Sequence, residues 1–213
     1  MLVAEVMTRN PVTIRDDDGI DEGLHLMRER KVRRLPVLDA SGKMVGIVSD
    51  KDLLHAAPSP ATSLSVHELH YLLAKLKIKQ VMSGPVITVT PDTPVEEAAR
   101  IMADNKIGGL PVMGEKGDLA GIITETDIFK ALLVLMGART PGVRMTLSVK
   151  EGKGVLARLT RAIADTGANI VSLATHTGST EGSRLITVKA NDVEPDALRR
   201  AVEGLGLEVV DLR

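Results

Sequence analysis

Two short stretches decide the fold: Gly46-Ile47-Val48-Ser49-Asp50-Lys51-Asp52 and Gly121-Ile122-Ile123-Thr124-Glu125-Thr126-Asp127. Each reads as an aliphatic strand that ends in a hydroxyl residue, with an aspartate three positions later, and they lie 75 residues apart, from Gly46 to Gly121. Other pairs share this offset: Val6-Met7-Thr8 with Val81-Met82-Ser83, Thr13 with Thr88, and Leu35-Pro36-Val37 with Leu110-Pro111-Val112. A common offset indicates two copies of one structural unit, which we place at residues 1–57 and 78–136.

The pattern within each copy predicts a β-α-β-β-α unit. A β-prone run opened by proline comes first, at residues 11–14 and 85–89. Apolar residues at helical spacing follow: Ile20, Leu24 and Met27 in the first copy, and Val95, Ala98 and Met102 in the second. Two more strands and a helix that begins near the hydroxyl residue complete the unit. Because each small sheet needs cover on one face, we expect the two units to pack as a pair.

The rest of the chain predicts a linker and a further domain. Residues 58–77 predict a loop and then a helix over residues 65–77, which Ser65 and Glu68 open as a capping box. Alternating and helical apolar patterns over residues 143–213 predict the order βαββαβ, the ferredoxin-like arrangement. The predicted fold class is therefore α/β, of the α+β kind.

The amino-acid composition excludes several classes of functional site. The chain has 213 residues, a net charge of −1 and no cysteine, which excludes disulfides, thiolate metal sites and cysteine nucleophiles. One Tyr, one Phe and no Trp leave almost no rings on which single-stranded nucleic acid could stack. No apolar run is long enough to span a bilayer, and because the N-terminal stretch carries Glu5 and no long apolar run, we do not expect it to be a signal peptide. We expect a cytoplasmic protein that binds neither nucleic acid nor membrane.

The repeated Gly-x-x-Ser/Thr-x-x-Asp motif is where we expect ligand chemistry. The hydroxyl of Ser49 or Thr124 lies at the first turn of a helix, beside backbone N–H groups that suit a phosphate. The carboxylate of Asp52 or Asp127 can accept from both hydroxyls of a ribose, and the glycine leaves room for a ligand near the backbone. The alternative is an ordinary capping box, and both interpretations can hold together.

Basic residues crowd the first copy at the end of its predicted helix. They are Arg28, Arg30, Lys31, Arg33 and Arg34. The second copy has Gly108-Gly109 where the first has Arg33-Arg34. One interpretation is a solvated helix end that the helix dipole favours. The other is a cluster beside Ser49 that neutralises a polyphosphate, in which case the first site favours more phosphates than the second.

Other signals for catalysis or metal binding are weak. His67 and His70 share a helical face, but no further ligands are specified. The run Asp16-Asp17-Asp18 lacks the periodicity of a calcium loop. No nucleophile-elbow, P-loop or zinc-protease motif occurs. We expect a protein that is not an enzyme, holds no metal and requires no cofactor.

The repeated motifs resemble those of a known family. Val-Met, Pro-Val with a nearby Thr, Leu-Pro-Val and Gly-Ile-(Val/Ile)-(Ser/Thr)-x-x-Asp, given twice, resemble a tandem pair of cystathionine-β-synthase (CBS) domains, a Bateman module. The tail resembles an ACT domain through Gly154-Val155-Leu156-Ala157, which opens a helix, and Gly167-Ala168-Asn169-Ile170, which opens a strand. The whole chain is similar to the acetoin-utilisation (AcuB) family.

The resemblance implies a regulatory protein that binds an adenine nucleotide of the AMP, ADP and ATP class in the cleft between the two units, with S-adenosylmethionine as an alternative. The residues that match the family's nucleotide-binding positions are Thr13, Arg34, Leu35, Pro36, Val37, Ser49, Asp52, Thr88, Leu110, Pro111, Val112, Thr124 and Asp127. The resemblance places the threonines of the first strands near the base and the two Leu-Pro-Val runs around its pocket. It places the hydroxyls of Ser49 and Thr124 toward phosphate, and Asp52 and Asp127 toward ribose.

In the tail, the resemblance implies a ligand edge that takes an amino acid or serves only for dimerisation. This edge consists of Gly154, Val155, Leu156, Asn169 and Ile170. Lys153 stands where the family often has Pro, which favours dimerisation.

We also expect a homodimer, because the helices of one pair would leave Leu24, Met27, Val95 and Met102 partly exposed. Nucleotide occupancy would be relayed to the ACT domain or to an unidentified regulated protein, in acetoin or carbon metabolism. The alternative from another class is a dimeric assembly scaffold with vestigial pockets.

Overall fold

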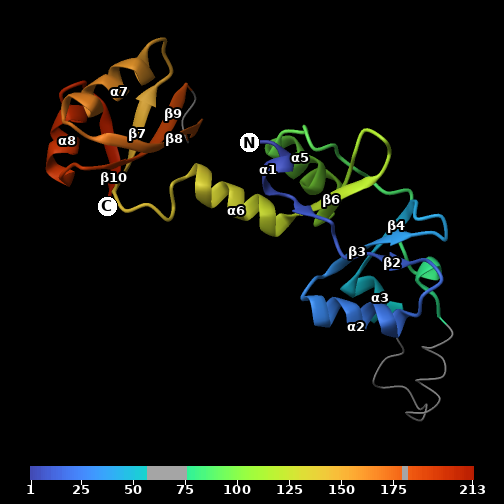
Figure 1. Ribbon diagram of the computed structural model, residues 1–213. Helices are drawn as coiled ribbons and strands as arrows, with labels where there is room; N and C mark the ends of the chain where they lie inside the picture. Colours follow the sequence, from blue (N-terminus) through green and yellow to red (C-terminus); the bar gives the residue numbers. More distant parts are fainter. Residues whose placement is uncertain (57–75, 179–181) are drawn as a thin grey trace. The chain divides into compact units, whose positions relative to one another are not determined.

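The chain forms two compact units, Met1–Phe129 and Lys130–Arg213 (Figure 1). This computed structural model describes residues 1–56, 76–178 and 182–213. The first unit contains both sequence copies, and the second contains the end of one helix and the whole tail.

The first copy folds around a three-stranded sheet in the order β2-β3-β4. Its elements are α1 (Val3–Val6), β1 (Thr8–Arg9), β2 (Ile14–Arg15), α2 (Ile20–Arg30), β3 (Arg34–Leu38), β4 (Met44–Ser49) and α3 (Asp50–Ala56). Because β3 is the central strand, Leu35 and Val37 have no exposed surface and join a core with Ile20 and Leu53. The predicted β-α-β-β-α order is confirmed in this copy.

The second copy repeats the helices and the strand hairpin, but its sheet has the order β1-β6-β5, so that β6 is central. Its elements are the 3-10 helix η1 (Ile78–Gln80), α5 (Val95–Asn105), β5 (Gly109–Met113), β6 (Leu119–Thr124) and α6 (Glu125–Leu135). The strand expected over residues 85–89 is reduced to a single bridge between Val89 and Val112. The proline that opens this run removes a backbone donor, and Gly84-Pro85 is a cis peptide.

The two copies exchange the chain segments that carry the repeated Val-Met motif. β1 pairs with β6 of the second copy, and Ser83 forms a bridge with Ile47 of the first. Met7 therefore lies against Gly121, and Met82 lies against Gly46, so closely that a Cβ on either glycine would overlap the methionine sulfur. We expected these glycines to leave room for a ligand, but the crossing chain occupies that room instead.

The helices bury the apolar residues that the spacing predicted. Met27, Val95 and Met102 are each at most 5% exposed, and Leu24 is half-buried. The expectation that they form an exposed dimer surface is wrong, because Val95 is buried and the other three pack in or against the core of their own copy. Both helices end on a lysine in the left-handed conformation, Lys31 after α2 (φ 54°) and Lys106 after α5 (φ 55°).

The predicted linker helix over residues 65–77 falls almost wholly outside the described residues, as do His67 and His70. Leu76 and Lys77 are described and are not helical. Lys77 instead forms a bridge with Gly19, and the carbonyl of Leu76 accepts from the backbone N–H of Ile20 at 3.2 Å.

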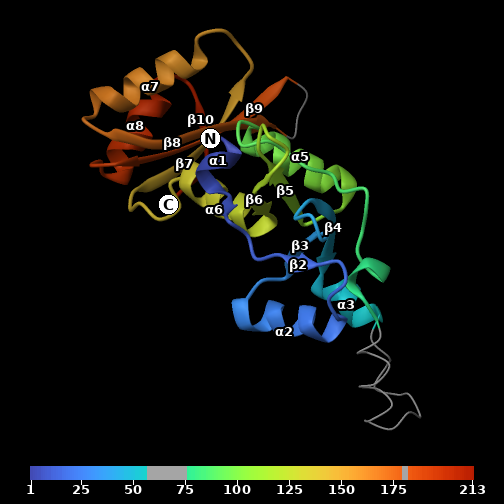
Figure 2. The same ribbon diagram turned by 45° about the vertical axis from the view of Figure 1, so that its right-hand side comes forward.

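The tail has the predicted βαββαβ order. Its elements are β7 (Val143–Lys150), α7 (Val155–Asp165), β8 (Asn169–Thr177), β9 (Ser183–Asn191), α8 (Pro195–Glu203) and β10 (Glu208–Leu212). The sheet is antiparallel in the order β10-β7-β9-β8, and Figure 2 shows α7 and α8 together beside it. Leu159 and Ile163 of α7 and Leu198 and Val202 of α8 pack on the strands in one core.

Candidate functional site

Two cavities lie between the sequence copies of the first unit, and they are built from equivalent residues. The Thr124 cavity has a volume of about 270 Å³ and is lined by Thr8, Asn10, Pro11, Val12, Lys31, Val32, Arg33, Arg34, Ile122, Thr124, Thr126 and Asp127. The Ser49 cavity has a volume of about 370 Å³ and is lined by Ser83, Pro85, Val86, Ile87, Lys106, Ile107, Gly108, Gly109, Ile47, Ser49, Lys51, Asp52 and Arg34. Apart from Arg34 in the Ser49 cavity, every residue of one cavity has its counterpart 75 positions away in the other.

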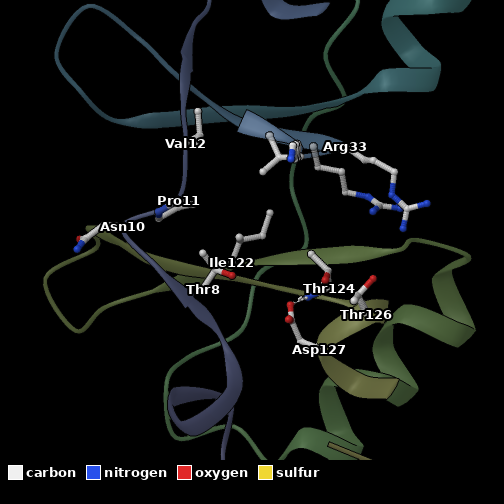
Figure 3. A pocket seen from close by; sticks show the side chains of 12 residues that line it. Thr8, Asn10, Pro11, Val12, Arg33, Ile122, Thr124, Thr126 and Asp127 are labelled. Carbon is white, nitrogen blue, oxygen red and sulfur yellow. Dashed lines mark hydrogen bonds between the residues drawn. The ribbon is translucent and has the colours of Figure 1, made fainter. Parts of the chain in front are cut away.

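Each cavity is composed of both copies because the chain crosses between them. In the Thr124 cavity, the crossing segment after β1 and the turn between α2 and β3 come from the first copy. The end of β6 and the first turn of α6 come from the second copy. Figure 3 shows Arg33 on one side of this cavity, with Thr124, Thr126 and Asp127 on the other and Val12 and Pro11 near the crossing segment.

In both Ser/Thr-x-x-Asp motifs, the aspartate accepts from the hydroxyl residue that precedes its helix, as in a capping box. Oδ2 of Asp127 accepts from the backbone N–H of Thr124 at 2.9 Å and from its hydroxyl at 2.7 Å (Figure 3). Oδ2 of Asp52 accepts the same two bonds from Ser49 at 2.8 and 2.7 Å, and the N–H of Asp52 donates back to the Ser49 hydroxyl at 3.3 Å. A carboxylate accepts more than two hydrogen bonds, so this role is compatible with ligand binding.

The basic cluster is not where we expected it. Arg33 lines the Thr124 cavity rather than lying beside Ser49, because the crossing brings the turn before β3 to the second copy's helix. The Ser49 cavity carries Lys51, where the other cavity has Thr126. Each cavity is therefore lined by three cationic residues, and the expected preference of the first site for more phosphates is not supported by charge.

Several expected binding residues do not line either cavity. The two Leu-Pro-Val runs are buried in their sheets, with Leu35, Val37, Leu110 and Val112 at 0% exposure. They cannot surround a base, because β3 and β5 pack against the cores of their own copies. Thr13 and Thr88 also lie outside the lining residues. Of the expected set, the structure brings together Ser49, Asp52 and Arg34 in one cavity, and Thr124, Asp127 and Arg34 in the other.

The sequence reasoning missed other residues that line the cavities. They are the segments after β1 and after Ser83, and Lys106, the lysine that ends α5. Lys106 had a usable signal, since it is the counterpart of Lys31 at the repeat offset, at a position where glycine commonly ends a helix.

In the tail, the expected ligand edge is partly exposed. Gly154 (φ 79°) is the N-cap of α7, Leu156 is 41% exposed, and Asn169 begins β8 opposite Asn191. Val155 and Ile170 are half-buried against the core. A cavity beside α7 is lined by different residues: Ala157, Arg158, Arg161, Ala162, Asp165 and Leu205.

Two absences hold for the described part of the chain. Among residues 1–56, 76–178 and 182–213, no cluster of three or more His, Asp or Glu side chains could hold a metal ion. Within the same ranges, no helix is both long and apolar enough to cross a membrane.

The repeated architecture matches known proteins. A model of the CBS domain matches residues 3–59 and 78–134, which together make up more than half of the chain. The chain belongs to the CBS-domain family. A model of the TTHA0829-like ACT domain matches residues 141–213, so a tandem CBS pair, a regulatory module, precedes an ACT domain.

Three solved structures are similar to the CBS pair of this chain. The Vibrio cholerae protein AcuB is 33% identical with a TM-score of 0.53, over 65% of this chain and 95% of that one. CBSX2 of Arabidopsis thaliana, solved with AMP, is 33% identical with a TM-score of 0.50, over 62% and 96%. The CBS pair of protein MJ0100, solved with 5′-methylthioadenosine and S-adenosyl-L-methionine, is 26% identical with a TM-score of 0.53, over 66% and 98%.

Proposed function

We propose that the CBS pair binds an adenine nucleotide of the AMP, ADP and ATP class in the Thr124 and Ser49 cavities, as a regulatory ligand. The observation that carries the proposal is the duplication of the cavities. At equivalent positions, each has a hydroxyl and a carboxylate at a helix N-terminus, a lysine and three aliphatic side chains, and both share Arg34. The complexes of CBSX2 and protein MJ0100 with adenosine compounds support the ligand class.

The lining residues suit the three parts of a nucleotide. Val12, Val32 and Ile122 provide an apolar wall for a base in the Thr124 cavity, which needs no aromatic ring. Cationic side chains of the same cavity suit phosphate, because charge-assisted hydrogen bonds to phosphate are strong. Asp127 suits a ribose, since one carboxylate can accept from both of its hydroxyls.

Binding would regulate the ACT domain or an unidentified partner protein, in acetoin or carbon metabolism, without a catalytic step. Such coupling requires the nucleotide to bind one arrangement of the protein better than another. An amino acid at the ACT edge of Gly154, Leu156 and Asn169 would be a second regulatory ligand.

Calorimetry with AMP, ADP, ATP, S-adenosylmethionine and 5′-methylthioadenosine tests this function on the purified chain. Asp127→Asn and Asp52→Asn serve as a matched pair, one in each cavity. Each substitution should lower the nucleotide affinity of its own cavity by about tenfold to a hundredfold, because a hydrogen bond to a charged group is worth roughly 1.5–3 kcal/mol. The ligand-free melting temperature should change little, since the amide oxygen still accepts from the Thr124 or Ser49 N–H.

Two outcomes contradict the proposal. A lowered ligand-free melting temperature with unchanged affinity would make each aspartate a capping residue only. No heat and no thermal shift with any of the five compounds would favour the dimeric scaffold with vestigial pockets, because a ligand at a hundredfold excess over Kd stabilises by about 2.7 kcal/mol.

A further inference from the structure

One arginine is common to both cavities. Arg34 opens β3, and its side chain, 23% exposed, lines the Thr124 cavity and the Ser49 cavity alike. The other cations line a single cavity each: Lys31 and Arg33 the Thr124 cavity, and Lys51 and Lys106 the Ser49 cavity. Arg34 is thus a cation that two anionic ligands would share.

The sequence difference between the copies makes room for this side chain. The counterpart of Arg34 at the repeat offset is Gly109, and a Cβ on Gly109 would lie 3.2 Å from Cδ of Arg34. A Cβ on Gly108 would overlap the guanidinium itself. Because residues related by the repeat meet here, glycine in the second copy leaves room for the arginine of the first. The pair of glycines opposite Arg33 and Arg34 therefore has a structural reason.

Arg34 is connected to both cavities by different parts of the residue. Its backbone is the register partner of Ser49 in the β3–β4 ladder. Its guanidinium reaches the second copy, where Nη2 lies 3.9 Å from Oε2 of Glu125, the first residue of α6. Glu125 stands between Thr124 and Thr126, which both line the Thr124 cavity.

We propose that anionic ligands in the two cavities compete for Arg34, so that filling either cavity weakens binding in the other. This inference rests on the proposed function, since it requires a phosphate-bearing ligand. The first phosphate would neutralise the guanidinium and hold its fork of donors in one direction. The second phosphate would meet a neutralised cation and the negative charge of the first ligand. By linkage, the weakening is the same in both directions.

Two isoleucines allow occupancy to be measured separately. Ile122 lines the Thr124 cavity, and its counterpart Ile47 lines the Ser49 cavity. Isoleucine δ1-methyl NMR during titration of the full chain with AMP would give one curve for each cavity. Independent sites give hyperbolic curves. With a shared cation, at least one methyl should show a curve broader than a hyperbola. Asp52→Asn weakens binding in the Ser49 cavity and so removes the competing ligand. It should therefore raise the AMP affinity reported by Ile122 by about tenfold.

The decisive comparison is the same pair of titrations in the Arg34→Gln background, where Asp52→Asn should no longer change the Ile122 curve. Arg33→Gln is the matched control, because Arg33 lines the Thr124 cavity alone. Arg33→Gln should lower the AMP affinity reported by the Ile122 methyl and leave the effect of Asp52→Asn on that affinity unchanged. Gly108→Ala should displace the guanidinium of Arg34 without removing it, and should therefore abolish the coupling as Arg34→Gln does. It keeps the test valid if Arg34→Gln fails to fold.

The outcomes separate the two proposals. If AMP shifts both methyls with hyperbolic curves, and Asp52→Asn leaves the Ile122 curve unchanged, the competition for Arg34 is overturned and the nucleotide function stands. The competition is equally overturned if Arg33→Gln abolishes the coupling as fully as Arg34→Gln. If neither methyl responds to AMP, ADP or ATP, the proposed function itself fails, and the competition with it.

Discussion

Single residues explain why the repeated motif keeps its glycine and its aspartate. The aspartates cap α3 and α6, while Gly46 and Gly121 accept the methionine of the segment that crosses from the other copy. The methionine of each Val-Met motif therefore contacts the glycine of the Gly-Ile motif in the other copy. This contact fixes the crossing, and the crossing assembles each cavity from both copies.

The two glycines predict unequal effects of an added methyl group. A Cβ on Gly121 would lie 2.7 Å from Sδ of Met7 and 2.8 Å from the backbone oxygen of Thr8, which cannot move freely. Gly121→Ala should lower the free energy of unfolding by about 1–3 kcal/mol, as overpacking does. For Gly46→Ala, the three nearest atoms all belong to the flexible side chain of Met82, so the loss should be smaller. Urea denaturation measures both, and equal losses would contradict this account.

Asp39 predicts a pH effect in the hairpin between β3 and β4. Its carboxylate accepts from the hydroxyl of Ser41 at 2.6 Å and from the N–H groups of Lys43 and Ser41 at 3.0 and 2.9 Å. These bonds, the Ser41 hydroxyl first, hold the pKa of Asp39 below its ordinary value. The carboxylate therefore stabilises the fold above its ordinary pKa, and this contribution disappears as the pH falls through the lowered pKa.

Ser41→Ala should raise the pKa of Asp39 toward the ordinary value, as followed by carboxyl NMR. Asp92 is a suitable reference, because its pKa is also lowered by a hydroxyl, that of Thr90 in another turn, and it should not respond. An unchanged Asp39 pKa in Ser41→Ala would assign the shift to the backbone donors alone.

At the scale of elements, α2 and α5 both end on a lysine in the left-handed conformation, which glycine adopts more easily. Lys31 and Lys106 line equivalent cavities. Strained backbone at a ligand site indicates that the side chain is needed there. We infer that each lysine is kept for its charge toward the ligand.

Lys31→Gly and Lys106→Gly should therefore raise the free energy of unfolding by up to about 1 kcal/mol, while weakening nucleotide binding in the affected cavity by about tenfold. Asp192 provides a control, because it has a φ of 57° in the tail and lines neither cavity. Asp192→Gly should stabilise without any change in affinity. Lysine variants that gain stability and keep full affinity would show that the charge is not used.

Local periodicity sufficed to predict α2, α5, α7 and α8 and most strands, because Ile20 to Met27 or Val155 to Ile163 bury a face set by spacing alone. It could not predict which sheet the two-residue strand β1 would join, since that depends on contacts with β6, over a hundred residues away. The cavity residues divide in the same way, into those that a local motif predicts and those that depend on distant contacts. Ser49, Asp52, Thr124 and Asp127 were predictable from the motif, whereas Lys31, Arg33 and the crossing segments were placed by the exchange of chain between copies.

At the scale of the whole molecule, a group of exposed apolar side chains lies on α6 rather than on α2 and α5. Five large side chains of this helix are exposed: Phe129 (65%), Leu132 (52%), Leu133 (41%), Val134 (67%) and Leu135 (58%). Phe129, Leu132 and Leu133 have the i, i+3, i+4 spacing of one helical face. A contiguous apolar face of this kind marks an association surface. The homodimer stays a prediction, now argued from α6 instead of α2 and α5.

We predict a homodimer in which α6 faces a second copy of the chain, so light scattering at micromolar concentration should give about twice the 22.7 kDa chain mass. Phe129→Ser combined with Leu132→Ser should raise the dimer dissociation constant by at least about a hundredfold, because each buried side chain of this size contributes roughly 1.5–3 kcal/mol. Leu54→Ser is the control, since Leu54 is 55% exposed on α3, where its apolar neighbour Leu53 is buried.

Leu156→Ser tests separately whether the ACT edge forms the interface. A monomeric wild-type mass would exclude the dimer. A dimer unaffected by the α6 pair but dissociated by Leu156→Ser would move the interface to the ACT domain. Circular dichroism of each variant confirms that the loss of mass is not a loss of fold.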